Sequence, residues 1–536
     1  MAIFFLALFQ FCLFLDRRDI TTAHEGRVAA TAREMLASDE WLIPRVNDQL
    51  RLQKPPLPYW AAAGLWSLAG SADVWLARLP GAVCGAIATL LVMDLARLTL
   101  GRRAAWAAGM IWLSTWFVVD EYRKAMADPY LAFFALLAVW AWVRADLAAR
   151  VADPIRPLPA PRDGAPQPRV SLAGGLLLLA YLSAACGTLA KGPVVLLHLA
   201  MALLPYHLIH RCRPPALPLV HAVGVILFLA VSLAWPLQVA RHVPDAWSLW
   251  RSELAADRAA SGAKTSSIFH YVANLPVVTA PWTVLAGVGA VMSIVGRGGR
   301  DRRAAWPLAW LGLTVLAFSL VPMKKNTYLL PAMPVVALLA AAPVASILRA
   351  RRPSLTDRWL LAGHALAAVI AVAVVSLLAM PLPLAAVVIL FVLAAAWAAR
   401  RQLTFARTFA VTAVAFAVAV HVAGAWLVAR EDNRRSDRPF AHAVNDAVGS
   451  GPLYLVGPGL REDVLFYLGR TLPRMDSIGQ LPADLRGHAI VTSDHLDAAR
   501  RSPRAVAVAE SAPRPRSPKD QLGLFAIEPI APTTAP

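Results

Sequence analysis

Charged side chains of both signs stand in short stretches between long apolar segments, and their types suit contact with an anionic group. His24, Glu25 and Arg27 open the first stretch, and Lys54 precedes two prolines farther along. Later stretches contribute Asp120, Glu121, Arg123, Lys124 and Asp128, then Lys191, then Arg251, Glu253, Asp257 and Arg258, then Lys324, Lys325 and Tyr328. Lysine and arginine, with a tyrosine hydroxyl, suit a phosphate. A single charge at a helix end is usually structural, so only convergence of these groups would form a site.

The apolar segments that must position these residues are long enough to cross a membrane. The 536 residues are 58% hydrophobic and 16% charged, whereas a soluble domain is nearer half apolar and a quarter charged. Because about 20 apolar residues in a helix span a bilayer, the pattern predicts a polytopic α-helical membrane protein with about 13 transmembrane helices. The expected spans are residues 2–15, 74–95, 104–119, 129–143, 171–190, 192–209, 217–236, 270–295, 305–321, 329–347, 359–378, 382–399 and 406–428.

Arginine is concentrated in alternate loops between these spans, for example at 97–103, 297–303 and 400–407. Such loops are cytoplasmic by the positive-inside rule. The N-terminus is then cytoplasmic, and the C-terminus and the charged stretches above share the opposite face. This topology accounts for the net charge of +19, so we expect no nucleic-acid partner. The four cysteines have no ligand spacing and predict neither disulfides nor a zinc site.

Two regions stand outside the spans. The first outer loop, 16–73, carries an apolar stripe at Ala29, Ala32, Met35 and Leu36, which predicts a helix lying flat at the membrane interface, and a second apolar run follows at 57–68. Residues 1–430 would thus form the transmembrane domain. Residues 431–536 would form a small α/β domain with strands at 452–456 and 488–492, a helix at 461–468 and a disordered tail.

Several motifs, in order along the chain, resemble one family. They are HEGRVAATAREML at 24–36, DEWLIPRVN at 39–47, LQKPPLPYW at 52–60, WLARLP at 75–80, LAKGP at 189–193 and KKNTYLLPAMPVVALL at 324–339. This combination resembles the ArnT-like and protein O-mannosyltransferase-like lipid-linked glycosyltransferases of the GT-C superfamily. The resemblance implies a GT-C-like fold with interfacial periplasmic helices and a periplasmic C-terminal domain.

The resemblance also implies an activity and roles for individual residues. A sugar, such as 4-amino-4-deoxy-L-arabinose or another monosaccharide, would pass from a polyprenyl-phosphate carrier to an acceptor at the periplasmic face of the bacterial inner membrane. The acceptor would be lipid A, another glycan or a protein. Lys54, Arg258 and Tyr328 would hold the carrier phosphate, Arg27 and Asp128 would line the same cavity, and either Lys324 or Lys325 would support the phosphate.

Three positions depart from the family pattern. His24 stands where family members commonly have a catalytic aspartate, which leaves Glu25 as the neighbouring acid. Gln53 replaces a glutamate, and Glu253 replaces an expected histidine. Because the last two changes remove the ligands with which ArnT-like members hold a divalent metal, we expect no metal here and no other cofactor.

The acceptor decides the chemistry that these residues must supply. A hydroxyl loses a proton during attack, so His24 or Glu25 would act as base and Asp128 would orient the sugar or acceptor. A phosphate acceptor is already ionised and needs no base. Fixed cations neutralise the departing carrier phosphate in either case.

Two other functions are compatible with the sequence. A catalytically silent homologue in envelope glycan assembly would explain His24, although Lys54, Arg258 and Tyr328 are retained. A transporter of lipid-linked sugars would place its binding groups near the bilayer midplane between repeats, whereas here the ionisable residues gather at one face.

Overall fold

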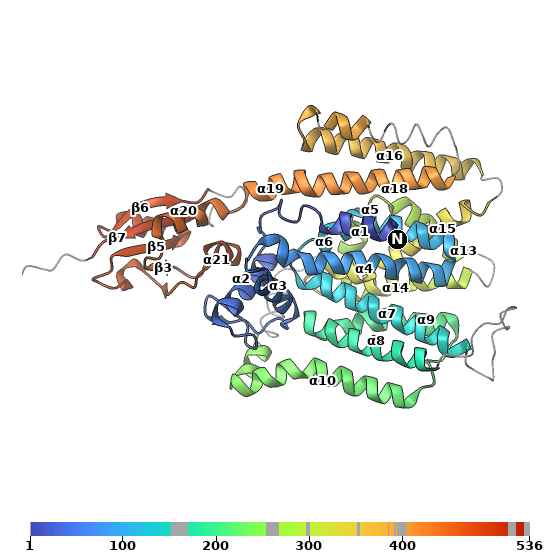
Figure 1. The fold of residues 1–536 in the computed structure, drawn as a ribbon, viewed down its shortest axis with the longest axis horizontal. Coiled ribbons are helices and arrows are strands. Elements are labelled where there is room, and N and C mark those ends of the chain that lie inside the picture. The colour runs from blue at the N-terminus through green and yellow to red at the C-terminus, as the bar shows by residue number, and fades with distance from the viewer. Residues whose placement is uncertain are drawn as a thin grey trace, which may run out of the picture. The chain divides into compact units, whose positions relative to one another are not determined.

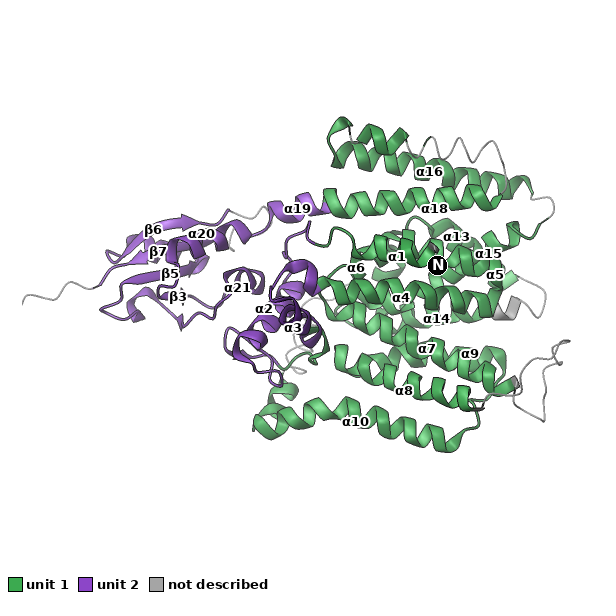
Figure 2. Cartoon of the chain, in the orientation of Figure 1, with its two compact units in different colours: residues 1–15, 52–58, 78–427 green, residues 16–51, 59–77, 428–536 purple. Residues whose placement is uncertain are grey.

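A computed structural model describes residues 2–151, 170–252, 267–295, 301–350, 354–383, 385–390, 393, 405–512 and 521–529. The chain divides into two compact units (Figure 2). One comprises Met1–Leu15, Leu52–Pro58 and Arg78–Leu427, and the other comprises Asp16–Arg51, Tyr59–Ala77 and Val428–Pro536. We call them the helical unit and the mixed unit.

The helical unit is built from apolar helices in the order shown in Figure 1. They are α1 (Ala2–Cys12), α4 (Val74–Leu100), α5 (Arg102–Ser114), α6 (Trp116–Tyr122), α7 (Ala127–Val151), α8 (Val170–Lys191), α9 (Val194–His210), α10 (Pro218–His242), α12 (His270–Val278), α13 (Thr283–Val295), α14 (Asp301–Ser319), the 3₁₀ helix η1 (Asn326–Ala332), α15 (Met333–Ile347), α16 (Leu355–Ala379), α18 (Phe405–Val422) and the π-helix η2 (Ala423–Val428).

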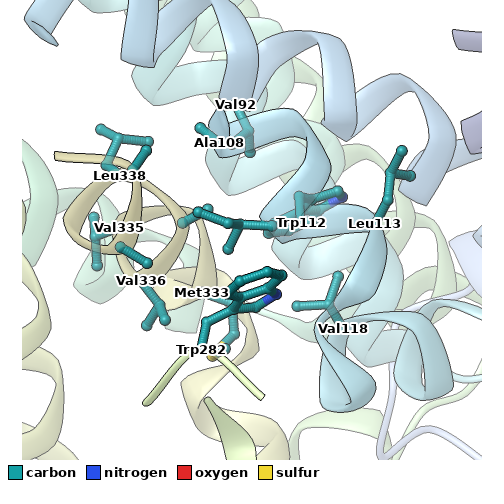
Figure 3. Packing of buried hydrophobic residues seen from close by; sticks show 14 of the residues in the cluster. Val92, Ala108, Trp112, Leu113, Val118, Trp282, Met333, Val335, Val336 and Leu338 are labelled. Atoms are coloured by element: carbon teal, nitrogen blue, oxygen red, sulfur yellow. The ribbon is translucent and has the colours of Figure 1, made fainter. Parts of the chain in front are cut away.

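The core of the helical unit lies where α4, α5, α6 and α15 meet (Figure 3). Trp112 and Trp282 are among its largest buried side chains, and Met333 and Val336 of α15 lie close to them. The indole Nε1 of Trp282 donates a hydrogen bond of 3.0 Å to Ser114 Oγ. This bond satisfies the polar atom of an otherwise apolar cluster, which an unpaired indole would destabilise.

Seven of the described helices are long and apolar enough to cross a membrane, or eight if the bent pair α12 and α13 forms one span. Shorter apolar helices at Ile3–Cys12, Val194–His210 and Ala305–Ser319 occupy three further expected positions. The expected span at 104–119 is interrupted at Thr115, where α5 ends. The chain is a multi-pass α-helical membrane protein, as expected, while the count of thirteen spans stays a prediction.

The mixed unit combines most of the first outer loop and the first four residues of α4 with the chain from Val428 onward. Its elements are α2 (Ala23–Ser38), β1 (Arg45–Val46), β2 (Gln49–Leu50), α3 (Leu57–Ala69), whose first two residues belong to the helical unit, α19 (Ala429–Arg434), α20 (Arg438–Val448), β3 (Leu453–Val456), α21 (Glu462–Leu468), β4 (Arg474–Met475), the 3₁₀ helix η3 (Ile478–Gln480), β5 (Gly487–Thr492), α22 (Ser493–Arg501), β6 (Ala505–Glu510) and β7 (Leu522–Ile527).

The strands β3 to β7 form a mixed five-stranded sheet in the order β4-β3-β5-β7-β6. β3 pairs in parallel with β4 and β5, whereas β7 pairs antiparallel with β5 and β6. β3, β5 and α21 confirm the two predicted strands and the predicted helix. β7 extends to Ile527, and residues 530–536, where the disordered tail is expected, lie outside the described part of the chain.

The apolar stripe of α2 is covered largely by protein, and the position of α2 at the membrane interface stays a prediction. Ala29, Ala32 and Met35 are at most 2% exposed. Gly26 allows α2 to approach α21 closely, since a Cβ there would lie 2.6 Å from the backbone nitrogen of Asp463. The sequence could not show whether protein or lipid covers this stripe, because packing against protein and insertion into lipid both require the same apolar face.

Candidate functional site

An ion pair between Asp128 and Lys191 is the centre of the candidate site in the helical unit. The two residues come from the start of α7 and the end of α8, and Nζ of Lys191 lies 2.5 Å from Oδ1 of Asp128. Both side chains are 14% exposed. The hydroxyl of Thr327 in η1 also hydrogen-bonds to Asp128, so three separate elements meet at this carboxylate.

The ring of Tyr328 also lies close to Lys191. Nζ of Lys191 is 5.0 Å from the centroid of the Tyr328 ring, which is within the range of a cation–π interaction. The sequence KKNTY therefore places Thr327 at Asp128 and Tyr328 at Lys191. Sequence reasoning noted Lys191 but assigned it no role; its signal was the LAKGP motif and the tight turn at Gly192, which has a φ of +83°.

Lys325 is held through its backbone next to η1. The hydroxyl of Tyr271 donates to the Lys325 carbonyl and accepts from the Lys325 amide, both at 3.2 Å. These bonds fix the segment from which Thr327 and Tyr328 project. Both side chains are half-buried, so burial does not distinguish Lys324 from Lys325 as the phosphate ligand.

Lys54 belongs to the helical unit through the short segment Leu52–Pro58. Its side chain is exposed, and it is close enough to Asp128 for an attractive electrostatic interaction. Trp250 anchors this segment by donating a hydrogen bond of 2.9 Å from Nε1 to the Leu52 carbonyl. The structure thus brings together three predicted site residues, Lys54, Asp128 and Tyr328, with Lys191, while their roles stay predictions.

A second charged group stands at the end of α6. Nζ of Lys124 lies 2.6 Å from Oδ2 of Asp120 and 2.6 Å from Oε1 of Glu121. Arg123 points elsewhere, donating to backbone carbonyls of Gln10 and Phe11. Arg123 therefore secures α1, whereas the other three form a compact cluster of charges.

His198 is a buried polar residue that sequence reasoning did not single out. It lies one turn into α9, is 1% exposed, and its Nδ1 has no hydrogen-bond partner among the described residues. It is close enough to Lys191 and Asp128 to interact with both electrostatically, and its ring centroid lies 5.1 Å from that of Phe318, with the two rings tilted by 32°. A lone histidine in an apolar helix gives no sequence signal for this position.

Three predicted site residues belong to the mixed unit. Arg27 Nε lies 2.7 Å from Glu462 Oε1 in α21. Glu25 is 4% exposed, and its backbone amide caps α2 by donating to the Thr22 hydroxyl. His24, one residue earlier, is exposed. Arg27 is thus occupied by a carboxylate, while the roles of His24 and Glu25 stay predictions.

Arg258 and Glu253 fall outside the described residues. Their predicted roles therefore stay predictions.

The apolar helices of the helical unit define a class of protein, the multi-pass α-helical membrane proteins. The whole chain superposes on the crystal structure of ArnT from Cupriavidus metallidurans in the apo state, with a TM-score of 0.75, 21% identity, and coverage of 98% of this chain and 97% of that one. The structure of the same protein bound to undecaprenyl phosphate gives a TM-score of 0.74 at 21% identity, with the same coverage. The predicted GT-C fold and the predicted resemblance to ArnT-like proteins are confirmed.

Sequence relatives agree with this fold. Residues 53–152 match the family described as dolichyl-phosphate-mannose-protein mannosyltransferase. A curated undecaprenyl phosphate-alpha-4-amino-4-deoxy-L-arabinose arabinosyl transferase from Sodalis glossinidius is 28% identical over 64% of this chain and 58% of its own length. A protein of the same description from Aeromonas salmonicida is 26% identical over 70% of this chain and 65% of its own length. The chain therefore matches less than two thirds of the length of these curated relatives.

Proposed function

We propose that this chain is an integral inner-membrane glycosyltransferase that transfers 4-amino-4-deoxy-L-arabinose, or a closely related monosaccharide, from undecaprenyl phosphate to lipid A. The observation that carries the proposal is the cluster of Lys191, Lys54 and Tyr328 around Asp128. The names of the relatives supply the carrier and the sugar. The N-terminus would be cytoplasmic, and the site and C-terminus periplasmic.

The cluster suits the departure of a carrier phosphate. In the transfer, an acceptor oxygen forms a bond to the anomeric carbon while the bond from that carbon to the phosphate oxygen breaks, and the phosphate leaves with the electron pair. Lys54 and Lys191 would neutralise the growing negative charge, and the Tyr328 hydroxyl would donate a hydrogen bond to it. Arg258, Arg27 and either Lys324 or Lys325 are further proposed phosphate ligands, on sequence grounds.

Asp128 would have a double task in this scheme. Its carboxylate fixes Lys191 through a short charge-assisted bond, and its remaining acceptor capacity is available to a hydroxyl of the sugar or acceptor. His24 or Glu25 is the proposed base for a hydroxyl acceptor. A phosphate of lipid A as acceptor would need no base, because it is already ionised.

The proposal is tested by comparing lipid A from cells with and without the gene by mass spectrometry. We expect the aminopentose substituent to be lost with the gene and restored by the wild-type chain, but not by Lys54→Met. An unchanged profile would support a silent homologue in envelope assembly.

A further inference from the structure

Two carboxylates at the end of α6 contact the same lysine. Asp120 and Glu121 each approach Lys124 Nζ to 2.6 Å. The side chains of Asp120, Glu121 and Lys124 are 14%, 8% and 16% exposed, so this group is largely removed from water. Lys124 contacts one oxygen of each carboxylate, Oδ2 of Asp120 and Oε1 of Glu121.

The second oxygen of the Glu121 carboxylate is not engaged by Lys124. Glu121 is 6% exposed, and its Oε2 is buried without a hydrogen-bond partner within the described parts of the chain. A buried carboxylate oxygen left without a partner is destabilising, because it has given up its water without replacement. The position therefore fits a group that brings both a positive charge and an N–H donor.

The other charges nearby increase this demand. Asp128 is close enough to repel Glu121 electrostatically. The cation nearest to Asp128 is Lys191, which is already bonded to it at 2.5 Å. The neighbourhood thus has a cationic part, at Lys191 and Lys54, and an anionic part, at Asp120 and Glu121.

We propose that Glu121, supported by Asp120, binds the ammonium group of an amino sugar on the lipid-linked donor. The inference rests on the proposed function and names the chemistry by which the donor sugar is selected. A donor of this kind is a zwitterion: its phosphate suits the lysines, and its ammonium suits the carboxylate pair. An alkylammonium has three N–H donors, and charge-assisted bonds to a carboxylate are the stronger kind.

A metal ion is a poorer occupant than an ammonium group. Among the described residues, no group of three or more histidine, cysteine, aspartate or glutamate side chains could hold a metal ion. Lys124 also places its own ammonium between the two carboxylates, where a divalent ion would be repelled.

The test uses the purified full-length chain in lipid nanodiscs with two synthetic undecaprenyl-phosphate donors. One carries the 4-amino-4-deoxypentose, and the other carries a hydroxyl in place of the amine. Wild type should prefer the amino donor in kcat/KM. Glu121→Gln should lower kcat/KM for the amino donor about tenfold to a hundredfold, mainly through KM, and change the hydroxyl donor by less than about threefold. Glu121→Asp, which keeps the charge, should retain part of the preference.

A matched control and three contrary outcomes make the test decisive. Asp94→Asn removes a carboxylate that pairs with Arg97 and Arg144 outside the site and should leave the preference between donors unchanged. Equal loss with both donors in Glu121→Gln would mean a structural role and overturn the inference. Equal kcat/KM for both donors in wild type would overturn it without any variant, even if Glu121→Gln failed to fold. Wild type inactive with both donors would instead refute the proposed function, and the inference would fall with it.

Discussion

Removing either partner of the ion pair between Asp128 and Lys191 should strongly destabilise the helical unit. Removing both partners together should reduce the free energy of unfolding by less than the sum of the two single changes. The pair joins α7 to α8 at 2.5 Å with both side chains 14% exposed. Removing one partner of a buried pair leaves the other charge unpaired and typically costs about 3–5 kcal/mol. We therefore expect Lys191→Met and Asp128→Asn each to reduce the free energy of unfolding by about 3 kcal/mol or more.

The double variant decides whether this coupling is real. Once both charges are gone, no unpaired ion remains, so Asp128→Asn with Lys191→Met should recover at least about 2 kcal/mol relative to additivity. Unfolding of the purified chain would be followed by tryptophan fluorescence in a titration with SDS. Interhelical hydrogen bonds in membrane proteins average only about 0.6 kcal/mol in such cycles. A coupling no larger than that would refute the view that this pair organises the site.

Three further predictions concern residues with different kinds of contact. Gly26→Ala should destabilise the mixed unit by about 1–3 kcal/mol, because the new Cβ would lie 2.6 Å from the Asp463 amide; unchanged thermal unfolding would contradict the close packing of α2 on α21. Burial, opposed by Arg461, raises the pKa of Asp463 to about 6, from an ordinary aspartate value of about 3.9. Its stabilising contribution is therefore complete below about pH 4 and is lost as the pH rises through 6, on the order of 3 kcal/mol in all. Hydrogen exchange of the α21 amides, corrected for intrinsic rates, should show this loss in wild type and not in Asp463→Asn, and equal pH dependence in both would contradict it. Lys54→Met should raise the KM for the lipid-linked donor about tenfold while changing stability by less than about 0.5 kcal/mol, because the side chain is exposed; a large loss of stability with unchanged KM would show that Lys54 is structural.

Much of the architecture could be predicted from the sequence because hydrophobicity controls it. Apolar stretches became helices close to the expected bounds, and the strands around Leu455 and Ile490 follow from short apolar runs between turn residues. The partner of the α2 stripe could not be predicted, since an apolar face does not specify what covers it. The location of Gly26 against Asp463 depends on residues separated by more than four hundred positions in the sequence.

The candidate site was only partly predictable for the same reason. Lys54, Asp128 and Tyr328 could be proposed from motifs, and the structure adds how Asp128 and Tyr328 are connected, through Lys191. Glu121 was noted as one charge among several, because a sequence cannot reveal that one of its oxygens is buried without a described partner. Its proposed role in selecting the sugar emerges only from three-dimensional placement.

The most direct test of the account is transfer by the purified chain itself. The chain in nanodiscs would be incubated with undecaprenyl phosphate-linked 4-amino-4-deoxy-L-arabinose and lipid A, and the products would be identified by mass spectrometry. We predict lipid A carrying the aminopentose, in amounts that fall at least tenfold in Lys54→Met and in Asp128→Asn. Folded wild-type protein that binds the donor and yields no modified lipid A would contradict the proposed lipid A transferase.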